Sequence, residues 1–157
     1  MKLFFRLIVI SLFLFSLVSG FGLTATAQPQ TSPFAAIERS SPQDWIRQEQ
    51  IKVYKDRVVI DLPNVTWATL TNTNSMDPLL DENANVLEIF PSSAEEINVG
   101  DVISYRTPYG LIIHRVVGIG VDEAGDYFIA QGDNNPLADP LKIRFADIHG
   151  VVVAVFY

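Results

Sequence analysis

The chain has 157 residues, of which 48% are hydrophobic and 18% are charged, and it suits one compact domain with an N-terminal segment. Eighteen acidic residues against 11 basic ones give a net charge of −7, which disfavours binding to the phosphates of nucleic acids. The absence of cysteine excludes disulfides, thiolate catalysis and cysteine-ligated zinc, and two histidines argue against a multi-histidine metal site. No metal or organic cofactor is therefore expected.

The N-terminus has the features of a targeting segment. Lys2 and Arg6 precede an uncharged, mostly apolar run over residues 7–23, and Ala25-Thr26-Ala27 then places small residues where a signal peptidase cuts. The run is at the short end for a membrane span, so residues 1–27 are interpreted as either a signal peptide or a signal-anchor helix. Both interpretations place the rest of the chain outside the cytoplasm, because the basic flank stays inside.

The predicted location follows from this choice. An uncleaved segment gives a single-pass membrane protein with its folded domain on the extracytoplasmic face, and cleavage after Ala27 gives a secreted protein. Lys2 and Arg6 are the basic residues of the segment, so the remainder carries nine basic against 18 acidic residues, a net charge of −9. Anionic lipid headgroups repel such a surface, so we expect membrane attachment through the N-terminal segment.

Residues 28–50 are predicted to form a linker and a short helix. The Ser-Pro-Gln-Asp sequence that starts at Ser41 is typical of a helix N-terminus, and we expect the helix to continue to about Glu49. It would expose Trp45 and Ile46 on one side. These two side chains either pack on the domain or touch the bilayer surface.

From residue 51 onwards, short runs rich in β-branched and aromatic residues alternate with turns of Gly, Pro, Asn and Asp. Many short strands and one short helix predict a mostly β, barrel-like domain over residues 51–157. The expected strands cover residues 51–54, 58–61, 66–70, 86–90, 102–106, 111–118, 127–131 and 151–156.

Ser75 follows the strand expected over residues 66–70 and is a candidate nucleophile. A serine hydroxyl attacks only when a base takes its proton and hydrogen-bond donors stabilise the oxyanion that follows. Thr73 offers a hydroxyl donor for that oxyanion, and the backbone N–H of Ser75 offers a second. Alternatively, Ser75 belongs to a polar loop in which its side chain caps local backbone groups.

His114 interrupts an otherwise apolar strand. Histidine is the side chain best suited to take a proton near neutral pH, although a histidine on an apolar strand is more often a hydrogen-bonded core residue. Strand alternation points Arg115 to the opposite face, where we expect it to pair with a carboxylate. His149 lies at a turn into the last strand and is expected to be an ordinary surface residue.

Asp133 and Asp139 lie six residues apart in a loop rich in Gly, Asn and Pro. Local turn chemistry explains this composition, but one carboxylate could instead fix the tautomer of His114 and stabilise its imidazolium. The other would hold the loop through backbone N–H groups. The sequence leaves open which aspartate faces His114. A serine, a histidine and an aspartate, each at the rim of a β segment, together indicate a hydrolase.

Four motifs combine these candidates. They are Asn74-Ser75-Met76-Asp77-Pro78, Val99-Gly100-Asp101-Val102-Ile103, Ile113-His114-Arg115-Val116-Val117, and Gly132-Asp133-Asn134-Asn135 with Asp139. In sequence and order they resemble the nucleophile, strand, general-base and acidic boxes of the type I signal peptidase family, in its archaeal and endoplasmic-reticulum branch. The resemblance extends from about Ile51 to Tyr157.

The resemblance implies an antiparallel β catalytic domain. It assigns Ser75 as the nucleophile, His114 as the general base, Asp139 as the triad carboxylate and Asp133 as a supporting acid. The bacterial branch of the family uses a lysine as the base, but the one lysine downstream of Ser75 is Lys142, which lies outside the general-base motif. The Ser–His version is therefore the one that fits.

The function that the resemblance implies is that of a serine endopeptidase. Such an enzyme cleaves signal peptides from secretory preproteins after small residues at positions −1 and −3. Two alternatives stay open, a non-catalytic extracytoplasmic β-domain that binds a partner and a protease dedicated to one surface substrate. The expected partners are secretory preproteins and the membrane, without nucleic acid, and accessory subunits are not identified by the sequence.

Overall fold

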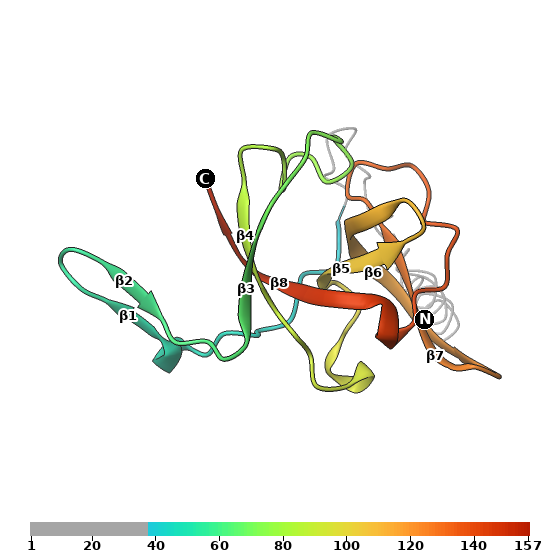
Figure 1. Ribbon diagram of the computed structural model, residues 1–157, viewed down its shortest axis with the longest axis horizontal. Helices are drawn as coiled ribbons and strands as arrows, with labels where there is room; N and C mark the ends of the chain where they lie inside the picture. The colour runs from blue at the N-terminus through green and yellow to red at the C-terminus, as the bar shows by residue number, and fades with distance from the viewer. Residues whose placement is uncertain (1–37) are drawn as a thin grey trace, which may run out of the picture. The chain divides into compact units, whose positions relative to one another are not determined.

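In the computed structural model, the described residues 38–157 form one compact unit, Glu38–Tyr157, which is mostly β with antiparallel strands (Figure 1). The predicted N-terminal helix and most of the predicted linker lie outside these residues. The strands are β1 (Ile51–Val53), β2 (Val58–Ile60), β3 (Val65–Thr69), β4 (Asn85–Ile89), β5 (Val102–Thr107), β6 (Gly110–Asp122), β7 (Gly125–Gln131) and β8 (Ile148–Phe156). Three short 3₁₀ helices accompany them: η1 (Gln48–Gln50), η2 (Ala94–Glu96) and η3 (Phe145–Asp147).

All eight predicted strands are present, with ends that differ from the prediction by at most four residues. The largest difference is at the end of β6, which continues to Asp122. Gly125 explains this extension, because its φ of 97° lies in the left-handed region and lets a tight turn join β6 directly to β7. The Asp-Glu-Ala-Gly-Asp stretch is thus the tip of a long hairpin.

Six strands form one antiparallel sheet in the order β3-β4-β8-β5-β6-β7. The sheet is open, so the prediction of a barrel-like closure is wrong, although the mostly β, antiparallel prediction is confirmed. The outer edge of β7 shows why the two ends do not meet. Phe128 and Ile143 exchange two backbone hydrogen bonds of 2.9 Å, and the N–H of Asp139 donates to the carbonyl of Ala130 at 2.8 Å. The following loop therefore occupies the edge that closure would need.

Apolar side chains pack on both faces of this sheet. Strand alternation sends neighbouring residues Val102 and Ile103 of β5 into different clusters. The first cluster includes Ile103, Tyr105, Val116, Phe128 and Val151, and the second consists of Met76, Leu80, Val86, Val102 and Val152. The nucleophile motif is thus anchored in the second cluster through Met76, whereas His114 is the register partner of Ile103.

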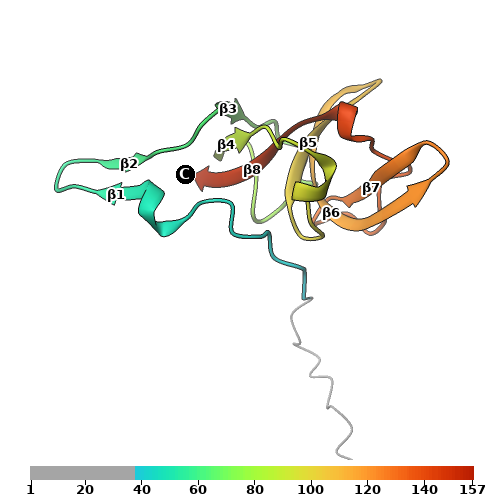
Figure 2. The ribbon, with the colours of Figure 1, turned by 90° about the horizontal axis from the view of Figure 1, so that it is seen from below.

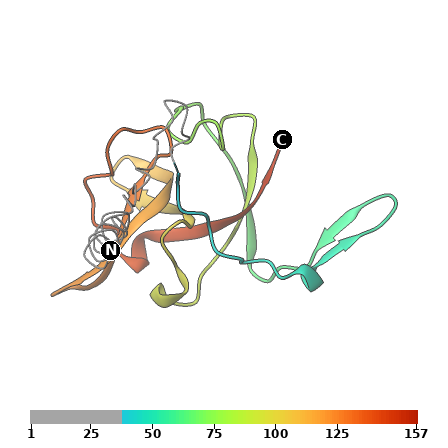
Figure 3. The same ribbon diagram turned by 180° about the vertical axis from the view of Figure 1, so that it is seen from behind.

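β1 and β2 form a separate two-stranded sheet, with Val53 opposite Val58. Three views show this hairpin extending away from the six-stranded sheet (Figure 1, Figure 2 and Figure 3). Its base is closed by two hydrogen bonds between Gln50 and Asp61, one from each residue. Beyond this base, the main contacts of β1 and β2 within residues 38–157 are with each other.

The helix predicted from Ser41 to about Glu49 is wrong. The chain from residue 38 to residue 47 has no helical turn, and only η1 follows it. The buried carboxylate of Asp101 explains this, because its Oδ1 accepts hydrogen bonds of 3.0 Å from the backbone N–H of Gln43 and from the indole N–H of Trp45. Tertiary hydrogen bonds thus override the local helix-start sequence.

The Trp45 side chain is half-buried and packs against the first cluster, which confirms packing on the domain for this residue. Within residues 38–157, no helix has the length and apolar character needed to cross a membrane.

Candidate active site

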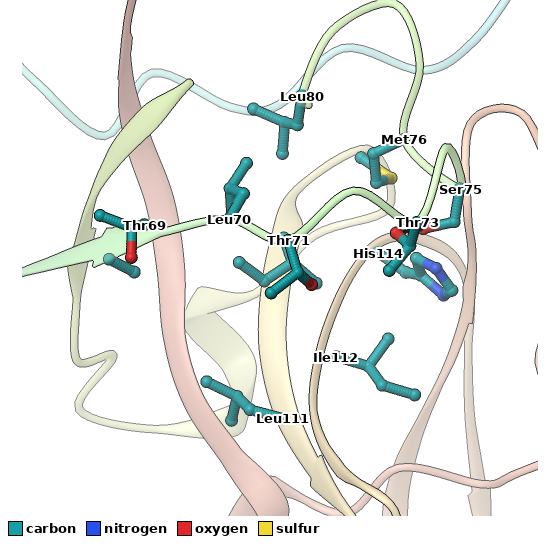
Figure 4. Close-up of a pocket in the computed structure, with 12 residues that line it drawn as sticks. Thr69, Leu70, Thr71, Thr73, Ser75, Met76, Leu80, Leu111, Ile112 and His114 are labelled. Carbon is teal, nitrogen blue, oxygen red and sulfur yellow. Dashed lines mark hydrogen bonds between the residues drawn. The ribbon is translucent and has the colours of Figure 1, made fainter. Parts of the chain in front are cut away.

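A cavity of about 390 Å³ opens at the end of the nucleophile motif (Figure 4). Ser75, Thr73 and His114 lie together on one side of it, as their labelled side chains show. The rest of its wall is largely apolar and includes Ala68, Leu70, Met76, Leu80, Ile112 and Ile113. The candidate nucleophile and the candidate base, 39 positions apart in the sequence, thus face one space.

The backbone conformation of Asn74 sets the position of Ser75. Asn74 has a φ of 56°, in the left-handed region that asparagine tolerates better than most residues. The chain then turns through Met76, whose carbonyl accepts from the N–H groups of Leu79 and Leu80 at 3.0 Å. Ser75 is therefore at the start of a tight turn, half-exposed at the rim of the cavity.

The Ser75 hydroxyl lies 3.1 Å from the Thr73 hydroxyl, and either oxygen can donate. The predicted oxyanion donor is thus beside the predicted nucleophile. Among residues 38–157, no hydrogen bond joins the Ser75 hydroxyl directly to the His114 ring. Hydrogen bonds between a nucleophile and its base are often long in the absence of substrate.

His114 is buried on β6, and its Nδ1 lies 2.7 Å from Oδ2 of Asp139. The backbone of Asp139 is itself fixed, because its N–H donates to Ala130 at the edge of β7. With Nδ1 facing a carboxylate, Nε2 is the nitrogen left to accept a proton. The alternative that sequence left open is therefore answered: Asp139 is the aspartate that faces His114.

Asp133 lies on the other side of the strand and contacts Arg115. Its two carboxylate oxygens accept from Nε and Nη2 of Arg115 at 2.8 and 2.7 Å, a bidentate pair in which both side chains are buried. Arg115 Nη1 also donates to the carbonyl of Gly100 at 2.8 Å. The prediction that Arg115 pairs with a carboxylate is confirmed, and Asp133 braces the loop at this point.

Tyr105 belongs to the site but was not recognised from the sequence. Its side chain is fully buried on β5, and its hydroxyl donates to the same Asp139 oxygen that faces His114. Burial raises the pKa of Tyr105 well above its ordinary value of 10.0, and the hydrogen bond to Asp139 raises it further. The phenol therefore stays protonated and remains a donor. Two strand positions away from the Gly-Asp motif, Tyr105 looks in the sequence like any core aromatic residue.

Asn134 belongs to the acidic motif, but the sequence assigned no role to it. Its backbone N–H donates to the carbonyl of Ser75 at 2.9 Å, and its side-chain amide donates to the carbonyl of Asn74 at 2.9 Å. Gly132 lies so close that a Cβ placed on it would be 2.5 Å from the Ser75 carbonyl oxygen. The acidic motif thus holds the backbone of the nucleophile motif, which local turn chemistry does not reveal.

His149 does not line the cavity. It is half-buried, with Nδ1 3.4 Å from the fully buried carboxylate of Glu88 and its ring 5.5 Å from that of Phe90. The prediction of an ordinary surface histidine is therefore wrong, because the buried carboxylate draws the ring onto the sheet. Among residues 38–157, no group of three or more His, Cys, Asp and Glu side chains is placed to hold a metal ion.

Comparison with protein-family models and with curated proteins gives no match for this chain. The fold and the site therefore define its class by themselves. It is a mostly β protein with an open antiparallel sheet, in which a serine and a histidine line one largely apolar cavity and an aspartate contacts the histidine ring.

Proposed function

We propose that this chain is a signal peptidase-like serine endopeptidase, which cleaves signal peptides from secretory preproteins after small residues. The observation that carries the proposal is that Ser75 and His114 face one cavity while His114 Nδ1 contacts Asp139 at 2.7 Å. The four motifs that resemble the family support the same conclusion, because the loop that carries Asp133 and Asp139 contacts both the motif at Ser75 and the motif of His114 on β6.

The proposed reaction begins when the Ser75 hydroxyl turns from Thr73 toward Nε2 of His114. Nε2 takes the hydroxyl proton while Oγ attacks the carbonyl carbon of the scissile peptide bond. The carbon–nitrogen bond then breaks, and the imidazolium returns its proton to the leaving amine. A water molecule, deprotonated by His114, hydrolyses the resulting ester and restores Ser75.

The remaining groups have supporting roles in this proposal. The carboxylate of Asp139 stabilises the imidazolium and holds its ring, as in other triads. The backbone N–H of Ser75 and the hydroxyl of Thr73 donate to the oxyanion. Asp133 acts through Arg115 and supports the loop. We further propose an extracytoplasmic location, either tethered by the N-terminal segment or secreted after cleavage following Ala27.

The test is cleavage of a preprotein peptide with an Ala-x-Ala site by the full chain in detergent or bilayers. Ser75→Ala and His114→Ala should each lower kcat by about 10³-fold or more, because the members of a triad act as a unit. Matched controls are Ser92→Ala, on an exposed serine, and His149→Gln, which keeps a hydrogen-bonding side chain near Glu88.

Near-wild-type cleavage by a folded His114→Ala variant would refute the mechanism. If well-folded wild type leaves the Ala-x-Ala peptide intact, labelling by a fluorophosphonate separates the two alternatives. Labelling of Ser75 would then favour a protease dedicated to another substrate, and its absence would favour a binding domain without catalysis.

A further inference from the structure

The β1–β2 hairpin carries an apolar face that the other described residues leave largely uncovered. Register and strand alternation place Ile51, Val53, Val58 and Ile60 on one face. Ile51, Val53 and Val58 are 43%, 76% and 59% exposed, and Ile60 at the base is half-buried. The second face is also part apolar, with Val59 next to Lys52.

An exposed apolar face of this kind is stabilised when a binding partner covers it. An isolated two-stranded hairpin is marginally stable in water, and β-branched side chains contribute little to it unless they are buried. Contiguous exposed apolar surface on a soluble unit commonly marks a site of protein or membrane contact. The hairpin also extends away from the main sheet, so its sides are accessible (Figure 1).

The charge of the hairpin indicates what kind of partner covers its apolar face. Residues 51–60 contain Lys52, Lys55 and Arg57 against a single acid, Asp56, which gives a net charge of +2. The remaining described residues have six basic against 17 acidic side chains. Residues 51–60 thus contain one-third of the basic residues of the described unit. The hairpin is therefore a cationic and apolar projection on a strongly acidic protein.

The tip adds an aromatic residue to this pattern. The N–H of Tyr54 donates to the carbonyl of Arg57 at 2.8 Å and closes the turn, and the Arg57 guanidinium lies 5.0 Å from the centre of the Tyr54 ring. Tyrosine prefers the boundary between headgroups and acyl chains, and the long stems of lysine and arginine let their charges reach headgroups while apolar neighbours go deeper.

We propose that the β1–β2 hairpin docks on a bilayer surface that contains anionic lipids. Ile51, Val53 and Val58 enter the boundary between headgroups and acyl chains, and Lys52, Lys55 and Arg57 contact the anionic headgroups. The net charge of the whole chain predicts repulsion, but the hairpin projects a locally opposite charge, and electrostatic potential falls off within about 10 Å at 0.1 M salt. This proposal stands independently of the proposed peptidase activity.

A projecting hairpin fits a lipid surface better than a protein groove. Apolar and cationic side chains are mixed on and around it, with charge at the tip, and a fluid headgroup layer can accommodate both without a shaped partner. A second copy of the chain, whose remaining surface is acidic, and an acidic protein are the competing occupants. The experiment must therefore report contact with lipid itself.

The absence of cysteine from the chain makes a site-specific probe possible. The full chain with Val53→Cys, labelled with an environment-sensitive NBD fluorophore, is reconstituted in vesicles of phosphatidylcholine with or without 30% phosphatidylglycerol. Docking should shift the emission to the blue in the anionic vesicles, and brominated acyl chains should quench it. The matched control is Tyr109→Cys, at a residue that is 96% exposed in the β5–β6 turn, and its probe should stay in water.

A second variant tests the electrostatic part. Each basic residue near an anionic surface strengthens docking by about fivefold, so Lys52→Gln, Lys55→Gln and Arg57→Gln together should lower the docking constant by about 100-fold. These side chains lie outside the packed clusters, and an unchanged thermal unfolding curve will show that the fold is kept. Raising the salt concentration should weaken docking of the parent chain in the same direction.

Three results would overturn the proposal. The first is a probe at Val53→Cys that remains in water in anionic vesicles. The second is a blue shift without quenching by brominated lipid, which depends on protein concentration or on an added acidic protein and so indicates a protein occupant. The third is a blue shift that is quenched equally in neutral vesicles and survives the triple substitution, because the cations then have no part in docking.

Discussion

Tyr105→Phe is the substitution that tests the candidate site most directly. It removes one oxygen, the hydroxyl that donates to Oδ2 of Asp139, and keeps a ring of nearly the same volume in the first cluster. His114 then becomes the one remaining side-chain donor to that carboxylate oxygen among the hydrogen bonds of the described residues. The fold should survive, because the buried apolar contacts of the ring are retained.

The expected loss of activity follows from the strength of this hydrogen bond. A hydrogen bond to a charged group contributes about 1.5–3 kcal/mol. If Tyr105 holds Asp139 in place while the imidazolium forms, most of that energy is expressed in the transition state. Because about 1.4 kcal/mol corresponds to tenfold in rate, kcat/KM should fall by about 10- to 100-fold. The effect should be smaller than that of Ser75→Ala, since the three residues of the proposed triad remain.

The same substitution changes how stability depends on pH. Burial, and then the hydrogen bond to Asp139, raises the pKa of Tyr105 in the folded state above its ordinary value of 10.0. The stabilisation is therefore complete below pH 10 and is lost as pH rises beyond it, because the unfolded chain releases a proton that the folded chain keeps. Each pH unit above 10 should lower the free energy of unfolding by about 1.4 kcal/mol, and phenylalanine removes this dependence.

The assay compares wild type, Tyr105→Phe and a matched control, Tyr109→Phe, on an exposed tyrosine. Cleavage of the Ala-x-Ala peptide gives kcat/KM, and urea unfolding at pH 7, 10 and 11 gives the slopes. The expected result is lower kcat/KM and a shallower alkaline slope for Tyr105→Phe only. Wild-type kcat/KM together with a wild-type slope would show that the phenol does not donate to Asp139, and the positioning argument would fail.

Two further substitutions test the loop and an ion pair. Gly132→Ala should place a methyl group against the Ser75 carbonyl, where a Cβ would lie at 2.5 Å; we expect a cost of about 1–3 kcal/mol in urea unfolding and slower fluorophosphonate labelling of Ser75. Equal labelling rates would argue against this contact. The pKa of Asp122 is held well below its ordinary value of 3.8, first by the Arg144 guanidinium and then by Lys142, so this group contributes stability above pH 3.8 that is lost as pH falls further. Asp122→Asn should therefore lower the urea midpoint at pH 7, and the difference from wild type should become smaller as pH falls from 4 to 2; a constant difference across this range would contradict the assignment.

Local sequence was sufficient to predict the strands, because β-branched runs and turn residues act over a few positions. It failed for the helix at Ser41, whose start sequence is overridden by a buried carboxylate 60 positions away. The prediction of a closed sheet failed for a similar reason, because the loop that contains Asp139 and Ile143 pairs with the edge of β7. Both errors come from hydrogen bonds between segments that are not adjacent in the sequence, and hydrophobic periodicity carries no information about such bonds.

In the site too, local sequence predicted some features, and contacts between distant segments decided the others. Residue chemistry singled out Ser75, His114, Asp133 and Asp139, because few other side chains offer a nucleophile, a base and a carboxylate in that order. It did not reveal Tyr105, whose position in an apolar strand predicts only burial. Local sequence also could not decide which of the two aspartates faces His114. The answer depends on which face of β6 each one meets, and this is fixed by the pairing of Arg115 with Asp133 on the face opposite His114.

The loop after β7, which the Arg115–Asp133 pair anchors, contacts most of the candidate site. The loop after β7 contacts the nucleophile turn through Asn134, the base strand through Asp133 and Arg115, and the imidazole through Asp139. Any displacement of the loop therefore moves the orienting carboxylate and the Ser75 backbone together. A carboxylate on a separate element could drift relative to the serine without straining either. Here the buried, bidentate Arg115–Asp133 pair also ties the loop to β6, so the same loop holds the proposed base, its aspartate and the proposed nucleophile relative to one another.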